Sequence, residues 1–95
     1  MNYELEGELF IWDTLKAKKN WYKHGVHFEE AATVFLDPML VIMNTSRNNK
    51  TREAAIGFDA TGRMLYVVHI EIEGTFIRII SARRAEPSEE ITYAF

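Results

Sequence analysis

The spacing of apolar residues changes along the chain, from a helical period before residue 38 to a strand period after it. Residues 8–12 (ELFIW) form a short apolar run that predicts a strand. Asp13 is a favourable N-cap, so the lysine-rich residues 14–24 are predicted to form a helix. A second helix is predicted over 28–36, where apolar side chains recur at helical spacing and two glutamates occupy the first turn.

The second half of the chain predicts strands separated by polar turns. Asp37-Pro38 ends the second helix, because the residue before a proline avoids helical geometry. The expected elements are then strands over 39–43, 52–58, 64–73 and 76–83, a polar loop over 44–51, a turn at Thr61-Gly62 and a helix over 87–94. Helices grouped before strands predict an α+β fold. We expect one domain, residues 1–95, with a curved antiparallel sheet, two N-terminal helices and a short C-terminal helix.

The two longest predicted strands also predict a register. We expect Gly74-Thr75 to join them as a two-residue turn. Such a turn places Glu71 opposite Arg78, and it places Tyr66 opposite Arg83. The core face would then carry Tyr66, Val68, Ile70, Ile72, Ile77 and Ile79, and the other face Val67, His69, Glu71, Arg78 and Ile80. A turn one residue longer would move one strand's side chains to the opposite face.

Composition and charge narrow the possible functions. The chain has no cysteine, which excludes disulfides and zinc–thiolate sites and fits a cytoplasmic protein. It shows neither a signal peptide nor an apolar stretch long enough to span a membrane. The net charge of −3 argues against binding of nucleic acid through the charge of the whole protein surface. Residues 16–24 and 78–84 are nevertheless basic, whereas residues 1–8 and 86–90 are acidic.

Two long segments resemble the signatures of the BrnT family of ribonuclease toxins. Residues 12–38 resemble its N-terminal signature, and residues 78–85 (RIISARRA) resemble its C-terminal one. The positions that match the first signature are Trp12, Asp13, Lys16, Asn20, Lys23, His24, Gly25, Val26, Phe28, Glu29, Glu30, Ala31, Phe35, Asp37 and Pro38. Further matches are Arg52, Ile56-Gly57, Arg63, Leu65, Val67, Val68, Glu89 and Tyr93. The sequence departs from the family at His27, where a small hydroxyl residue is common, and over residues 86–92, where the family is usually basic.

The resemblance implies a RelE-like fold and RNA cleavage by the toxin of a type II toxin–antitoxin pair. It also implies neutralisation by a cognate BrnA-type antitoxin, whose DNA-binding part would carry out autoregulation. We therefore expect an antitoxin and RNA as partners, DNA only through the antitoxin, and no membrane.

Lysine, histidine, arginine and tyrosine side chains suit RNA cleavage without a metal. When the ribose 2′-hydroxyl is the nucleophile, a base must take its proton, cations must stabilise the phosphorane, and an acid must protonate the leaving oxygen. The candidate catalytic residues are Lys16, His24, Arg52, Arg78, Arg83 and Tyr93, and the candidate RNA contacts are Lys19, Asn20, Lys23 and Arg84. The sequence shows no carboxylate–histidine cluster, so we expect no metal and no other cofactor.

Each candidate also has a purely structural interpretation. His69 is expected to be a half-buried strand histidine, and Trp12 to belong to the core. The structural alternatives are a solvated lysine face on the first helix, a contact of His24 with the helix dipole, a solvated strand end at Arg52, an Arg78–Glu71 ion pair, packing of Arg83 on Tyr66, and core packing of Tyr93. The leading function is thus a metal-independent endoribonuclease. The alternative is a degenerate toxin homologue that only binds its antitoxin.

Overall fold

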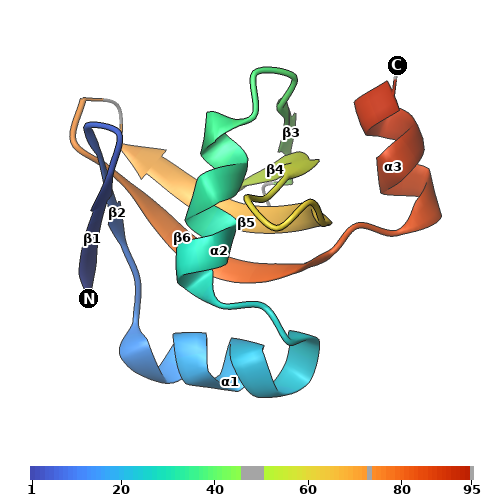
Figure 1. Ribbon diagram of the computed structural model, residues 1–95. Coiled ribbons are helices and arrows are strands. Elements are labelled where there is room, and N and C mark those ends of the chain that lie inside the picture. The colour runs from blue at the N-terminus through green and yellow to red at the C-terminus, as the bar shows by residue number, and fades with distance from the viewer. Residues whose placement is uncertain (46–50, 73, 95) are drawn as a thin grey trace.

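The computed structural model describes residues 1–45, 51–72 and 74–94 and has the predicted α+β fold (Figure 1). The elements are β1 (Asn2–Leu5), β2 (Glu8–Ile11), α1 (Thr14–His24), α2 (Phe28–Ala32), the 3₁₀ turn η1 (Thr33–Leu36), β3 (Val41–Asn44), β4 (Glu53–Phe58), β5 (Met64–Ile72), β6 (Phe76–Arg84) and α3 (Pro87–Ala94). The six strands form one sheet in the order β1-β2-β6-β5-β4-β3. Most of the loop predicted over 44–51 falls on residues 46–50, which lie outside the described residues. Within the described ranges, no helix is both long and apolar enough to cross a membrane.

The sheet is mixed, and not antiparallel throughout as predicted. β2 and β6 run parallel, with Phe10 opposite Ile77, while the other neighbouring strands pair antiparallel. The prediction was wrong because a parallel pair joins distant segments and leaves no turn signal in the sequence. It also missed β1, which is joined to β2 through Glu6 and Gly7. Both residues have positive φ, 52° and 80°, as the tight hairpin turn requires.

The long hairpin of β5 and β6 changes register at a bulge. Tyr66 lies opposite Arg83, as the sequence predicted. Nearer the turn, Arg78 is displaced by one residue from its predicted partner Glu71, so that part of the prediction was wrong. The two halves of the hairpin differ in register by one residue, because Ile80 has no partner on β5, as in a β-bulge.

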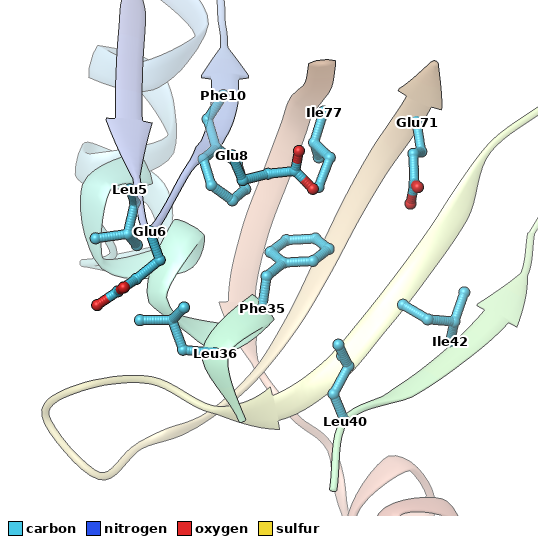
Figure 2. Close-up of a pocket in the computed structure, with 10 residues that line it drawn as sticks. All are labelled: Leu5, Glu6, Glu8, Phe10, Phe35, Leu36, Leu40, Ile42, Glu71 and Ile77. Atoms are coloured by element: carbon cyan, nitrogen blue, oxygen red, sulfur yellow. The ribbon is translucent and has the colours of Figure 1, made fainter. Parts of the chain in front are cut away.

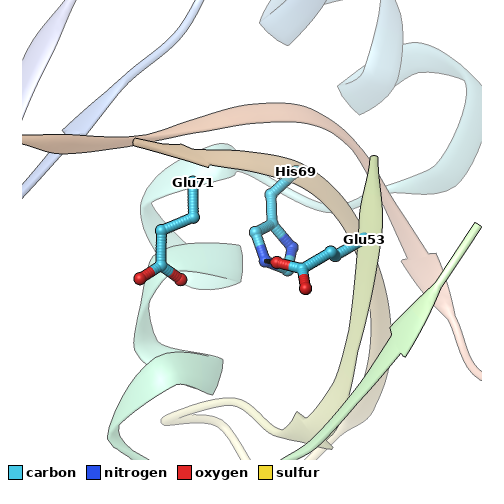
Figure 3. Close-up of side chains that lie close together, drawn as sticks. All are labelled: Glu53, His69 and Glu71. Atoms are coloured by element: carbon cyan, nitrogen blue, oxygen red, sulfur yellow. Dashed lines mark ion pairs between the residues drawn. The ribbon is translucent and has the colours of Figure 1, made fainter. Parts of the chain in front are cut away.

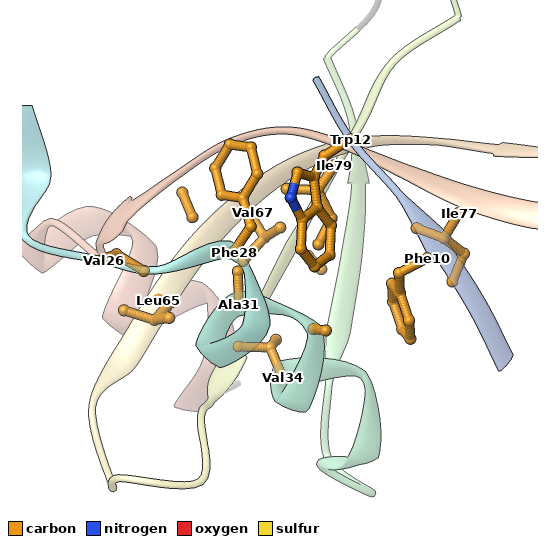
Figure 4. Close-up of a cluster of buried hydrophobic side chains, with 13 residues drawn as sticks. Phe10, Trp12, Val26, Phe28, Ala31, Val34, Leu65, Val67, Ile77 and Ile79 are labelled. Atoms are coloured by element: carbon orange, nitrogen blue, oxygen red, sulfur yellow. The ribbon is translucent and has the colours of Figure 1, made fainter. Parts of the chain in front are cut away.

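This register reverses the predicted face of β5. The turn is one residue longer than expected, since Ile72 pairs with Phe76 and Thr75 N donates to Ile72 O at 2.9 Å. The helix-covered face of β5 therefore carries Leu65, Val67 and His69, and the prediction of Tyr66, Val68, Ile70 and Ile72 was wrong. On β6 the prediction of Ile77 and Ile79 as core was correct. The core contains Phe10, Trp12, Val26, Phe28, Ala31, Ala32, Val34, Ala55, Leu65, Val67, Ile77, Ile79 and Ala82 (Figure 4).

The helices begin and end at residues suited to those positions. Asp13 caps α1 by accepting a hydrogen bond from Lys16 N at 3.0 Å, and Gly25 ends it with φ 67°. The helix predicted over 28–36 is observed as α2 followed by η1. His27 supplies no small hydroxyl group at the start of α2, but its own N–H donates to Glu30 Oε1 at 2.9 Å.

A charged network ties the β4–β5 turn to the helical layer. Arg63 contacts Asp59 Oδ2 and Glu30 Oε1, each at 2.9 Å, and donates to Gly25 O at 3.1 Å. Burial acts to raise the pKa of Asp59, but hydrogen bonds from Thr61 and Arg63 and the charge of Arg63 outweigh it and lower that pKa. The network therefore fixes the connection between α1 and α2 on the sheet.

Candidate active site

Asn20 attaches α1 to the edge of β6. Parallel pairing with β2 ends at Ile11, where the chain leaves the sheet for α1, so the later part of β6 needs other partners for its backbone. Asn20 Oδ1 accepts from Ala82 N at 3.0 Å, and Asn20 Nδ2 donates to Ala82 O at 2.8 Å and to Val26 O at 3.0 Å. The sequence suggested Asn20 as an RNA contact. Its carboxamide is buried and holds α1 in place, so we remove it from that set.

A basic groove runs between α1 and β6. It has a volume of about 210 Å³ and is lined by Lys16, Lys19, Asn20, Lys23 and His24 of α1 and by Ile80 and Ser81 at the bulge of β6. The helix places these residues because positions three and four apart share one face. Four residues that the sequence singled out for chemistry thus share one hollow: Lys16, Lys19, Lys23 and His24.

His24 is the group in the groove that can take up a proton at neutral pH. Burial lowers its pKa below the usual 6.5, and the positive charges of Lys23 and Arg83 lower it further. The imidazole is therefore mostly neutral at pH 7. Arg83 is not among the residues that line the groove, but its charge is one of the two that lower the pKa of His24.

Arg83 is bound by a carboxylate from α3. Its Nη1 donates to Glu89 Oε1 at 2.8 Å, its Nη2 to Glu89 Oε2 at 2.7 Å, and Glu86 lies 3.7 Å away. The guanidinium also lies over the ring of Tyr66, 4.2 Å from its centroid. The hydrogen bonds with Glu89 raise the pKa of Arg83 and lower that of Glu89. The carboxylate uses both arms of the fork, as a phosphate would.

Arg78 lies at the other end of α1. It is exposed, pairs across the strands with Ile70, and is among the charges that lower the pKa of Asp13 at the start of the helix. The predicted ion pair of Arg78 with Glu71 does not fit this register. Arg78 and Arg83 are five residues apart on one strand, roughly 15 Å. This spacing suits contacts with different phosphates of one RNA strand better than a shared contact with one phosphate.

Three other predicted residues lie outside the groove. Tyr93 donates its hydroxyl to Asp37 Oδ2 at 2.8 Å, and burial and Asp37 raise its pKa. Its ring meets Phe58 edge to face at 5.4 Å, so Tyr93 anchors α3. Arg84 lines a different hollow, and Arg52 directly precedes β4, two strands from β6.

The structure also assembles a carboxylate–histidine cluster, which the sequence analysis did not expect. One ligand atom each from Glu53, His69 and Glu71 lies within 4.8 Å of the others (Figure 3). His69 is fully buried, and not half-buried as predicted. The spacing of His69 and Glu71 was visible in the sequence, but Glu53 joins them only through the register of β4 and β5.

A second hollow, of about 310 Å³, lies beside this cluster on the helix-covered side of the sheet. Figure 2 shows Phe10, Phe35 and Leu40 around it together with carboxylates, among them Glu8 and Glu71. Its charge is thus opposite to that of the basic groove.

Comparison with known proteins places the chain in a family. Residues 12–89 match the profile described as ribonuclease toxin, BrnT, of type II toxin–antitoxin system. Among solved structures, the chain is similar to the Brucella abortus ribonuclease toxin BrnT, with a TM-score of 0.65 and 24% identity over 81% of this chain and 95% of that chain, a similarity that supports the fold. A search of curated proteins finds no match. Because the profile covers most of the sequence, the chain belongs to the BrnT family of ribonuclease toxins of type II toxin–antitoxin systems.

Proposed function

We propose that this toxin cleaves RNA at the basic groove without a metal, by attack of a ribose 2′-hydroxyl on the adjacent phosphate. The observation that carries the proposal is the position of His24, whose pKa is lowered by burial, in a hollow that Lys16, Lys19 and Lys23 also line. A neutral imidazole can remove the hydroxyl proton, and the ammonium groups can hold the phosphate and stabilise charge in the phosphorane. When the bond from phosphorus to the 5′-oxygen breaks, the imidazolium or one of the ammonium groups can give a proton to the leaving oxygen, and the products are a 2′,3′-cyclic phosphate and a 5′-hydroxyl.

Arg83 adds a further cation to the proposed site if the RNA phosphate replaces the carboxylate of Glu89 as its partner. Glu89 holds the guanidinium in a bidentate pair whose side chains are 31% and 15% exposed. Replacing that carboxylate by a phosphate keeps both hydrogen bonds, so the exchange costs little. In this arrangement Arg83 stabilises the phosphorane, and Arg78 contacts a phosphate further along the RNA.

A cleavage assay in excess EDTA tests the proposal. The wild-type chain is expected to cleave mixed RNA, and His24→Gln to be slower by about 10²-fold or more, because it loses a general base. Lys18→Ala is the matched control, since Lys18 is exposed on α1 and is not among the groove's lining residues. Equal rates for wild type and His24→Gln would overturn the assignment of the base.

The alternative is a homologue that binds its antitoxin without cleaving RNA. One observation favours it: Glu89, in an acidic C-terminal segment, accepts hydrogen bonds from both Nη atoms of Arg83 and so occupies the guanidinium. A lack of cleavage by both the wild type and Glu89→Gln would support this alternative, since the second variant frees the fork.

We further propose that the protein antitoxin of this system is BrnA-like, covers the basic groove and supplies the DNA binding. A chain of net charge −3 gains little from releasing counterions of DNA. Gel-shift titrations at physiological salt are expected to show operator binding by the toxin–antitoxin complex and by the antitoxin alone. Specific operator binding by the isolated toxin would contradict the proposal that the antitoxin supplies the DNA binding.

A further inference from the structure

The sheet brings together three side chains that the proposed nuclease site does not use. Glu53 on β4 and His69 on β5 are cross-strand partners, and Glu71 follows His69 by two residues on the same face. Their ligand atoms lie within 4.8 Å of one another (Figure 3). Phe35 of η1 meets the ring of His69 edge to face, with centroids 4.9 Å apart, and so restrains the imidazole.

His69 presents a buried nitrogen that lacks a hydrogen-bond partner. Its Nδ1 lies 3.1 Å from Val67 O, and because a carbonyl oxygen only accepts, Nδ1 carries the ring proton. Nε2 of the neutral ring then holds a free lone pair. This atom is buried without a partner, and Glu53 Oε1 lies 3.7 Å from it.

The lone pair of Nε2 therefore faces other acceptors. Carboxylates cannot donate a hydrogen bond, so Glu53 and Glu71 do not satisfy Nε2 while the ring is neutral. The buried nitrogen and the two carboxylates therefore present three acceptor groups to one cation.

We propose that Glu53, His69 and Glu71 bind a divalent transition-metal ion, with Zn²⁺ as the best match. One imidazole nitrogen and carboxylate oxygens are ordinary zinc ligands, at about 2.0–2.2 Å. In such sites the other ring N–H of the histidine is characteristically held by a backbone carbonyl, which is the role of Val67 O here. A tetrahedral site needs ligand atoms about 3.3 Å apart. Glu71 is exposed and Glu53 is half-buried, so both can close the remaining distance.

The position of the site separates it from RNA cleavage. His69 lies on the helix-covered face of the sheet, whereas the Arg83–Tyr66 pair lies on the opposite face. Glu71 also lines the acidic hollow of Figure 2, which leaves room for water as a fourth ligand. The bound ion would join β4 to the end of β5 and is predicted to stabilise the fold rather than to act in catalysis.

Metal titration of the EDTA-treated, dialysed full-length chain tests the site. Calorimetry with Zn²⁺ is expected to show one site, and Co²⁺ to give the visible absorption of a low-coordinate ion. Mg²⁺, which prefers an all-oxygen octahedron, is expected to bind far more weakly. Glu53→Gln and Glu71→Gln should each weaken Zn²⁺ binding by more than about tenfold. Glu4→Gln, on the exposed β1, is the matched control and should bind like the wild type.

A second measurement keeps the test independent of any effect of the variants on folding. The Nε2 resonance of His69 in the wild-type chain is expected to be that of an unprotonated nitrogen at pH 7 and to shift when Zn²⁺ is added. The proposal would be overturned by any of three results: no binding of Zn²⁺, unchanged affinity in both glutamine variants, or an Nε2 that is protonated in saturating Zn²⁺.

Discussion

His24 and His69 are two histidines whose pKa values are both lowered mainly by burial, yet their surroundings have opposite charge. His24 is half-exposed among lysines and near Arg83, whose positive charges lower its pKa further. His69 is fully buried between Glu53 and Glu71, whose negative charges oppose the effect of burial. The direction of a pKa shift alone therefore does not identify a site. The first environment attracts a phosphate and the second attracts a cation.

The largest effect is expected from Arg83→Ala, which removes the guanidinium whose charge helps to lower the pKa of His24. Loss of one preorganised group that stabilises transition-state charge lowers kcat by about 10²- to 10³-fold. The free energy of unfolding should change by less than about 1 kcal/mol, because the Arg83–Glu89 pair is partly exposed. Single-turnover cleavage and thermal melts measure the two effects. A variant that cleaves within twofold of the wild type would show that Arg83 serves only to hold α3.

The next effect is the pH dependence of kcat/KM, which reports the free enzyme. A base must be unprotonated, and the pKa of His24 lies below 6.5, so the rate should be level from pH 7 to 8. It should fall about tenfold per pH unit once the pH drops below that pKa. Proton NMR of the chain's three histidines identifies the group that titrates.

Two results would count against this assignment. One is a fall of kcat/KM at low pH whose midpoint lies above pH 6.5. The other is the same fall of kcat/KM at low pH in His24→Gln, which would show that another group titrates.

The smallest effect is expected from Glu89→Gln, which weakens the internal ligand of Arg83. A partly exposed ion pair contributes up to about 1 kcal/mol, so RNA binding should tighten roughly two- to fivefold. Fluorescence anisotropy with a labelled RNA measures the change. Glu90→Gln, an exposed neighbour on α3, controls for the loss of one negative charge. Equal tightening in both variants would point to general electrostatics instead of release of Arg83.

The sequence predicted features that depend on local pattern. Asp13 as a helix cap, the α+β class and the basic face of α1 all follow from residues within a few positions of one another. The lysines and His24 share the groove because a single helix positions them. Tyr66 does lie opposite Arg83 as predicted, but only because the bulge at Ile80 compensates for the longer turn.

Features set by long-range pairing could not be predicted from local pattern. The longer turn shifts the register of the turn side of the hairpin, and with it the face on which His69 lies, and the bulge at Ile80 restores the predicted register further along. Asn20 has its structural role because Ala82, 62 residues away, needs backbone partners at a strand edge. The Glu53–His69 pair likewise exists only after β4 and β5 have aligned. These contacts leave no periodic signal in the sequence.

The central position of β6 has a consequence for the order of folding during synthesis. Of the six strands described, β6 is the last to be synthesised, yet it joins the β1–β2 hairpin to β5. Chains elongate at about 5–20 residues per second, so both halves of the sheet emerge before the strand that joins them. A nascent chain that stops before residue 76 carries the lysines of α1 but lacks both the Ala82 partner of Asn20 and Arg83. The toxin therefore cannot assemble its groove until β6 has been synthesised and has left the ribosome.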